Sequence, residues 1–170
     1  MSKQWCRLSP TQDLNTCPKS INSDKSVHYS PIMNISLISL PRFTDPRGNL
    51  SVVEENQNVP FDIKRVFFTY DVPGGESRAD HANKTLIEFI VALSGSFTVA
   101  LDDGVEKKKV LLNKPYQGLL VNPMIWRKLE DFSSGAVALV ICSDFYNEDD
   151  YIRNYDDYLK AVSQDKQRYE

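Results

Sequence analysis

The sequence predicts an all-β fold, either a closed barrel or a jelly-roll sandwich, followed by one C-terminal helix. From residue 35 onward, short runs rich in Val, Ile, Leu and Phe recur, and turn-forming residues separate them. Strands do not alternate with helices, and no repeat of ~20–50 residues is present, which excludes doubly wound nucleotide-binding folds and solenoids. Small barrels hold one ligand among inward-facing side chains, so polar residues that interrupt apolar strands are the candidate site.

Each predicted strand is a short apolar run that ends at a turn. β-branched and aromatic residues are frequent in these runs, as is typical of half-buried strands. The predicted strands span residues 35–40, 50–53, 65–70, 86–93, 97–101, 105–112, 118–121, 125–129 and 136–142.

Turn residues separate these runs. The predicted turns occupy residues 45–48, 73–75, 94–96 and 102–104. Asp102-Asp103-Gly104 predicts a hairpin, because glycine tolerates the positive φ that tight turns need. The strand after this turn carries Lys107-Lys108-Lys109, which we expect to form a solvated edge whose charges oppose edge-to-edge pairing.

One amphipathic helix is predicted after the last strand. Asn147 can cap it, with Asp150 three residues later, and acidic residues favour the positive end of the helix dipole. The stripe with helical spacing consists of Ile152, Tyr155, Leu159 and Val162. We expect this stripe to pack on the sheet as part of the core.

Residues 1–33 are predicted to form a flexible N-terminal arm, and residues 34–165 to form the barrel domain. The arm lacks sustained periodicity and is rich in Ser, Asn, Pro, Lys and Gln. His28 lies in it and is expected to be solvated. The N-terminus is polar and lacks the apolar segment of a signal peptide, so we expect a cytoplasmic protein with reduced cysteines.

Composition excludes several classes of function. A net charge of −3 argues against a nucleic-acid partner, and no apolar run approaches the ~20 residues of a membrane span. Two histidines cannot form a three-histidine zinc site, and Cys6, Cys17 and Cys142 lack zinc-ligand spacing. We therefore predict no metal, no cofactor, no nucleic acid and no membrane association.

The densest polar cluster is Arg-Ala-Asp-His-Ala-Asn-Lys at residues 78–84. On an extended segment His81 and Asn83 share one face, with Asp80 and Lys84 on the other unless a bulge intervenes. An imidazole titrates near neutral pH and suits proton abstraction. His81 is therefore either a catalytic base, with Arg78 beside it, or a histidine that only makes a hydrogen bond at a strand end.

Arginines at turns and strand ends form a second candidate group. They are Arg47, Arg65, Arg78 and Arg127. If they converge, they suit a diphosphate, because guanidinium groups bind phosphate oxygens bidentately; otherwise they are scattered surface residues. Phe67 and Tyr70 follow Arg65, and Trp126 precedes Arg127; these aromatic residues either border a site or belong to the barrel core.

Several segments occur in a characteristic order. They are Asp45-Pro46-Arg47-Gly48, residues 60–66, residues 78–84, residues 118–121, Trp126, residues 131–134 and residues 143–155. In this order they resemble the sugar 3,4-ketoisomerases of the WxcM-like cupin family, over roughly residues 34–162. The most specific segment is Asp150-Tyr151-Ile152-Arg153-Asn154-Tyr155.

The resemblance implies a cupin jelly-roll barrel that forms a homodimer by exchanging N-terminal strands. The family acts without a metal on dTDP-4-keto-6-deoxyglucose, in the synthesis of surface-polysaccharide sugars, and moves the keto group from C4 to C3 through an enediol(ate). It implies that His81 is the general base, with Arg78 and Asn83 positioning substrate oxygens. The implied substrate-binding residues are Arg47, Arg65, Phe67, Tyr70, Lys84, Trp126 and Arg127.

The chain departs from the family pattern at two places. The family motif is Arg-Gly-x-His-x-His-Lys, and this chain has Asn83 at the position of the second histidine. An amide cannot shuttle a proton near pH 7. Where the family has Arg-Val-Tyr-Tyr, this chain has Arg65-Val66-Phe67-Phe68. It therefore lacks a phenol that could assist the second proton transfer, unless Tyr70 or a water takes that role. Two alternatives to the isomerase therefore stay open: a catalytically altered or inactive sugar-nucleotide-binding cupin, and a 3- or 5-epimerase acting on the same substrate.

Overall fold

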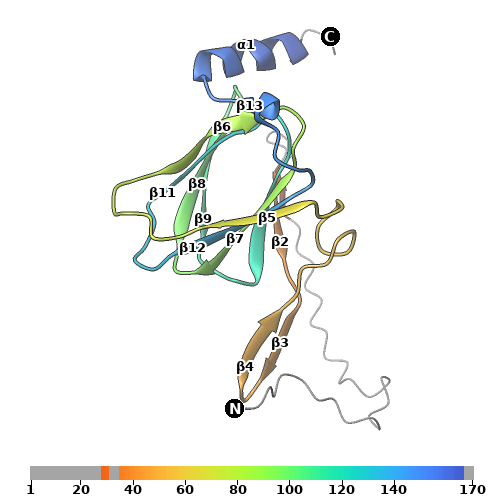
Figure 1. Ribbon diagram of the computed structural model, residues 1–170, viewed down its shortest axis with the longest axis vertical. Helices are drawn as coiled ribbons and strands as arrows, with labels where there is room; N and C mark the ends of the chain where they lie inside the picture. Colours follow the sequence, from red (N-terminus) through yellow and green to blue (C-terminus); the bar gives the residue numbers. More distant parts are fainter. Residues whose placement is uncertain (1–27, 31–34, 167–170) are drawn as a thin grey trace.

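Two antiparallel sheets face each other in the structure, a computed structural model that describes residues 28–30 and 35–166 (Figure 1). The six-stranded sheet consists, in spatial order, of β1 (His28–Ser30), β2 (Ile35–Ser39), β10 (Gln117–Val121), β7 (Glu88–Ser94), β12 (Val137–Cys142) and β5 (Arg65–Thr69). The five-stranded sheet consists of β13 (Tyr151–Ile152), β6 (Arg78–Asn83), β11 (Trp126–Glu130), β8 (Phe97–Asp102) and β9 (Lys107–Leu112). This arrangement confirms the predicted jelly-roll barrel.

The main hydrophobic core lies between the two sheets. Alternate residues of each strand enter it, as Ile90 and Ala92 do from β7 and as Val99 and Leu101 do from β8. Burying each large aliphatic or aromatic side chain contributes about 1.5–3 kcal/mol to the free energy of folding. This core fills only part of the barrel, and polar side chains occupy one end of the interior.

A second apolar cluster covers the outer face of the six-stranded sheet. Val59 and Phe61, from the segment between β4 and β5, pack there on Phe89 and Ile141. The sheet is therefore buried on both faces at its centre, which explains the nearly continuous apolar sequences of β7 and β12.

Most predicted strands are present, and the structure adds strands in polar sequence. The Asp102-Asp103-Gly104 turn joins β8 to β9 as predicted, and β9 with its three exposed lysines lies at the edge of its sheet. The predicted strand at 50–53 is instead β4 (Gly48–Ser51), which pairs with β3 (Arg42–Asp45) in an exposed hairpin. The hairpin projects from the end of the barrel opposite the C-terminal helix (Figure 1).

The prediction of one helix beginning after Asn147 is wrong. Asn147 caps only a short 3-10 helix, η1 (Glu148–Asp150); β13 then pairs with β6, and α1 begins at Tyr155 and runs to Lys166. Instead of completing a helical cap, the Asp150 carboxylate accepts hydrogen bonds from the backbone amides of Thr85 and Leu86, just before β7. Of the predicted stripe, Tyr155, Leu159 and Val162 lie on α1 and pack against the barrel, whereas Ile152 lies in β13. The fully buried residue of α1 is Tyr158, which the spacing did not select.

Much of the predicted N-terminal arm, including Cys6 and Cys17, lies outside the described residues. Within the arm, β1 pairs with β2, so residues 28–30 are a strand. In the described ranges no group of three metal-ligating side chains comes together. None of the helices in those ranges has the length and apolarity needed to cross a membrane.

Candidate active site

Polar side chains from both sheets meet at one end of the barrel interior. On the six-stranded sheet, Arg65 lies opposite Cys142, and Cys142 lies opposite Glu88. On the five-stranded sheet, Arg127 lies opposite His81. Directly opposite residues share a face of a sheet, and Cys142 belongs to the interior core, so Arg65 and Glu88 face inward with it.

An ion pair joins the two sheets inside the barrel. The Arg127 Nη2 and Glu88 Oε2 atoms are 2.7 Å apart, and the two side chains are only 1% and 6% exposed. Arg127 also donates through Nη1 to the Ile125 carbonyl at 3.3 Å. A buried pair of this kind seldom adds net stability, because desolvation offsets the attraction, so we interpret it as a feature of the site.

A β-bulge places His81 beside this ion pair. Ala79 and Asp80 both have positive φ, at 66° and 69°, and the β6–β11 register shifts between Arg127 and Lys128. At the bulge, the side chains of β6 no longer alternate regularly between the two faces of the sheet. The Asp80 carboxylate accepts a hydrogen bond from Trp126 Nε1 at 3.1 Å. The bulge separates this structural contact from the His81 side chain.

His81 is neutral at physiological pH. Its pKa is lowered to about 4, mainly by burial and then by the Arg127 cation, while the Glu88 carboxylate partly opposes both effects. The side chain is 9% exposed. A neutral imidazole has a free lone pair, which is the state a general base requires.

Tyr151 and Arg65 complete this end of the barrel. The Tyr151 ring centroid lies 4.8 Å from that of His81. Arg65 Nη2 donates to the Tyr151 hydroxyl at 3.4 Å and to Cys142 Sγ at 3.6 Å. Burial raises the pKa of the Cys142 thiol to about 11, so Cys142 stays protonated and is a small core residue.

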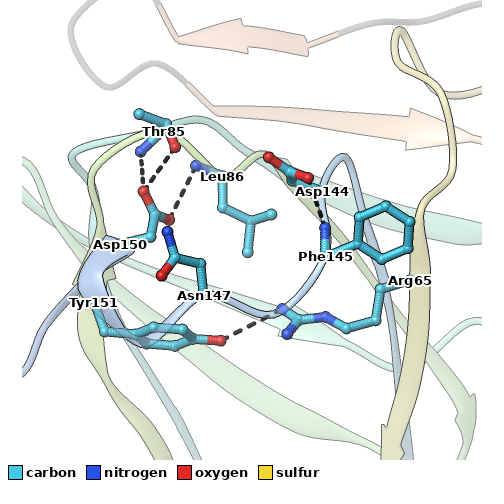
Figure 2. A pocket seen from close by; sticks show the side chains of 8 residues that line it. All are labelled: Arg65, Thr85, Leu86, Asp144, Phe145, Asn147, Asp150 and Tyr151. Carbon is cyan, nitrogen blue, oxygen red and sulfur yellow. Dashed lines mark hydrogen bonds between the residues drawn. The ribbon is translucent and has the colours of Figure 1, made fainter.

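A small pocket opens beside Arg65 and Tyr151 (Figure 2). Its volume is about 30 Å³, space for one or two water molecules. Its lining residues are Arg65, Thr85, Leu86, Asp144, Phe145, Asn147, Asp150 and Tyr151. Asp150 anchors the C-terminal part of this wall, accepting from the Thr85 amide at 2.8 Å, the Thr85 hydroxyl at 2.7 Å and the Leu86 amide at 3.2 Å. These bonds lower its pKa against the opposing effect of burial.

The structure brings together some of the predicted site residues. His81, Arg65 and Arg127 meet in the interior, and Phe67 faces the same way because it lies opposite the core residue Val140. Asn83 is fully buried and lies opposite Tyr151 in the β6–β13 pair. Arg78 starts β6 beyond the bulge, opposite Leu129.

Four predicted site residues lie outside this interior cluster. Trp126 faces away from Arg127 and packs under α1, 5.2 Å and 5.4 Å from the rings of Tyr155 and Tyr158. Tyr70 is exposed beyond the end of β5, next to Phe68. Lys84 donates to the Asp149 carbonyl at 2.7 Å, so it holds η1. Arg47 lies at the tip of the β3–β4 hairpin, ion-paired with Asp45 at 2.6 Å.

Glu88 and Tyr151 are the interior residues that the sequence reasoning did not select. Glu88 is the only carboxylate inside the predicted strand 86–93, and a charge in an apolar strand was a usable signal. Tyr151 lies in the most specific segment of the family resemblance, but the predicted helix hid its pairing with β6.

A jelly-roll barrel with a buried histidine and a buried ion pair at one end of its interior defines a cupin-type fold with a polar interior site. The chain belongs to the WxcM-like, C-terminal family (FdtA), which matches residues 33–163. It is 44% identical over 131 residues to the TDP-4-oxo-6-deoxy-alpha-D-glucose-3,4-oxoisomerase of Aneurinibacillus thermoaerophilus, a match covering 77% of this chain and 94% of that protein.

Solved structures agree with this family. A 3,4-ketoisomerase from Helicobacter canadensis has a TM-score of 0.76 and 38% identity, covering 77% of this chain and 98% of that one. A histidine-to-asparagine variant of the 3,4-ketoisomerase QdtA from Thermoanaerobacterium thermosaccharolyticum, in complex with TDP-4-keto-6-deoxyglucose, has a TM-score of 0.76 and 37% identity, covering 77% and 95%. A dTDP-4-dehydrorhamnose 3,5-epimerase from Bacillus anthracis is only 15% identical, with a TM-score of 0.65, covering 74% and 81%, and shares the fold alone.

Proposed function

We propose that this protein moves the keto group of a TDP-linked 4-keto-6-deoxyhexose from C4 to C3. The observation that carries this proposal is the neutral imidazole of His81 inside the barrel of a chain 44% identical to a TDP-4-oxo-6-deoxyglucose 3,4-oxoisomerase. The epimerase alternative has weaker support, because the epimerase structures are distant in sequence. The cytoplasmic location and the place in surface-polysaccharide synthesis remain predictions.

The site supports a proton shift through an enediolate. In the proposed reaction, His81 removes the C3 proton, which the neighbouring C4 ketone makes acidic, and later returns a proton to C4. The negative charge of the intermediate develops on oxygen, where a preorganised cation stabilises it most. Arg65, only partly buried and at the pocket, is our candidate for this contact, while Arg127 stays paired with Glu88 and sets the field around His81.

The test is incubation with TDP-4-keto-6-deoxyglucose in deuterated water, followed by proton NMR. An isomerase gives a 3-keto product with exchange at the carbons that lose and gain protons, and His81→Asn abolishes both. A product that keeps its C4 ketone with inverted C3 or C5 identifies an epimerase. Binding of the nucleotide sugar without exchange or product would contradict turnover of any kind.

Binding without turnover is the second candidate function. It is favoured by the interior face of β5, where Phe67 supplies no hydroxyl, and by Asn83, which supplies no second imidazole. The QdtA relative is in complex with TDP-4-keto-6-deoxyglucose as a histidine-to-asparagine variant, so that protein holds its sugar nucleotide with one histidine fewer. The deuterium experiment separates this candidate from the isomerase.

We also propose that the protein is a homodimer. The β3–β4 hairpin has exposed residues throughout, including Phe43 and Leu50, which are 53% and 56% exposed, and an isolated two-stranded hairpin is marginally stable in water. The apolar strand β5 lies at the edge of its sheet, with Val66 and Phe68 exposed. A second copy would cover both features. The predicted role of Arg47 in holding the substrate requires such a partner, because the hairpin tip points away from its own barrel (Figure 1).

A further inference from the structure

The proposed isomerisation moves two kinds of proton. One proton leaves C3 and one arrives at C4, and the imidazole of His81 suffices for both. The hydroxyl at C3 must also lose its proton as it becomes a ketone, while the oxygen at C4 must gain one. A single imidazole engaged with the carbons does not serve the oxygens, so a second proton-carrying group is needed, and Phe67 cannot supply it.

Tyr151 is a phenol placed on the interior side of β13. In the β6–β13 pair, Ile152 lies opposite Ala82, and both belong to the cluster under α1. Tyr151 is the next residue along the strand and so faces the other way, toward His81, whose ring centroid is 4.8 Å away. Its hydroxyl lies 3.4 Å from Arg65 Nη2, at the wall of the pocket (Figure 2).

The other phenols near this end are committed or remote. The Tyr146 hydroxyl donates to the Glu148 carboxylate, and the Tyr146 side chain is exposed. Tyr155, the first residue of α1, belongs to the cluster on the opposite face of the β6–β13 pair from His81, and its hydroxyl donates to Asp102. Tyr70 is exposed beyond the end of β5. Of these four tyrosines, Tyr151 is the one that faces His81 and has the Arg65 guanidinium beside its oxygen.

We propose that Tyr151 is the catalytic residue that carries the proton from O3 to O4 of the sugar, an inference that rests on the proposed isomerase function. The Tyr151 phenol donates its proton to O4 of the enediolate, and the guanidinium of Arg65 stabilises the resulting phenolate. As the C3–O3 bond becomes a carbonyl, O3 gives its proton to the phenolate, and C4 takes a proton from the His81 imidazolium. Both residues then regain their starting protonation states.

The variant Tyr151→Phe tests this role, because it removes the hydroxyl and keeps the ring against His81. Two rates are measured by NMR in deuterated water with TDP-4-keto-6-deoxyglucose: exchange of the C3 proton, and formation of the 3-keto product. Acid–base groups contribute about 10²–10⁴-fold, so we expect product formation to fall by at least ~100-fold. We expect C3 exchange, which needs only His81, to fall by less than ~10-fold.

Tyr155→Phe is the matched control, the same substitution at a phenol outside the site, and both of its rates should equal those of the wild type. Equal losses of exchange and conversion in Tyr151→Phe would mean that the residue only shapes the site, and an unchanged rate of conversion would mean that it carries no proton. Either result overturns the inference. A wild-type protein that neither exchanges nor converts the sugar refutes the proposed function, and this inference with it.

Discussion

His81 has an unusually low affinity for protons, and this property gives the site its pH dependence. Its pKa of about 4 lies well below the ordinary value of 6.5, mainly because burial disfavours the imidazolium. A general base works only when it is unprotonated, so kcat/KM should stay constant from pH 7 down to about pH 5 and fall as the pH drops through about 4. A pH–rate profile, combined with NMR titration of the imidazole, measures this.

Variants of the neighbouring ion pair provide the control for that profile. Arg127→Met removes a cation that lowers the pKa of His81, so the acid limb should move to higher pH. Glu88→Gln removes a carboxylate that raises this pKa, so the limb should move to lower pH. An inflection near 6.5 in the wild type, or shifts of the same sign in both variants, would show that burial and these two charges do not control the base.

The Arg127–Glu88 pair should also show strong energetic coupling. Removing one partner leaves the other charge buried and alone, so Arg127→Met and Glu88→Gln should each destabilise the protein by about 3–5 kcal/mol. The double variant leaves no unpaired charge and should lose much less than the sum of the two. Urea unfolding of all four proteins at pH 7 measures this coupling, and additive losses would mean that the ion pair does not bridge the sheets.

At the scale of the elements, the pairing of β10 with β7 depends on one glycine. A Cβ atom on Gly118 would lie 2.2 Å from the ring of Phe89, a fully buried residue of the outer core. Overpacking of this kind costs about 1–3 kcal/mol, so Gly118→Ala should lower the midpoint of thermal unfolding. Gly74→Ala is the matched control, because nothing lies near the Cβ position of Gly74. Equal stability of the two variants would contradict the close contact.

The strands that sequence analysis found and missed differ in how they are stabilised. β7 and β12 are buried on both faces, so their apolar sequence alone identified them. β6 is polar and bulged, and it is a strand because β11 and β13 pair with it on either side. Tertiary pairing of the same kind overrode the local capping signals after Asn147, which correctly predict a helical turn but not its end.

The site follows the same division. His81, Arg65 and Arg127 could be selected from the sequence, because each is a chemically distinctive residue in or beside an apolar strand. Trp126 could not be excluded in advance, since the face it occupies depends on the register of β11 against β6 and β8. The contact between Glu88 and Arg127 joins two sheets, and no local pattern in the sequence encodes it.

At the scale of the whole molecule, the exposed hairpin predicts the state of assembly. Phe43 and Leu50 are opposite each other on β3 and β4, and burying both against a second copy would stabilise the dimer. Light scattering during size-exclusion chromatography should therefore give about twice the chain mass of 19.4 kDa, and Phe43→Ser/Leu50→Ser should give the mass of one chain. Val105→Ser, which removes an even more exposed apolar residue from the β8–β9 turn, should stay dimeric. A monomeric wild type, or a hairpin variant that still dimerises, would show that this hairpin is not the interface.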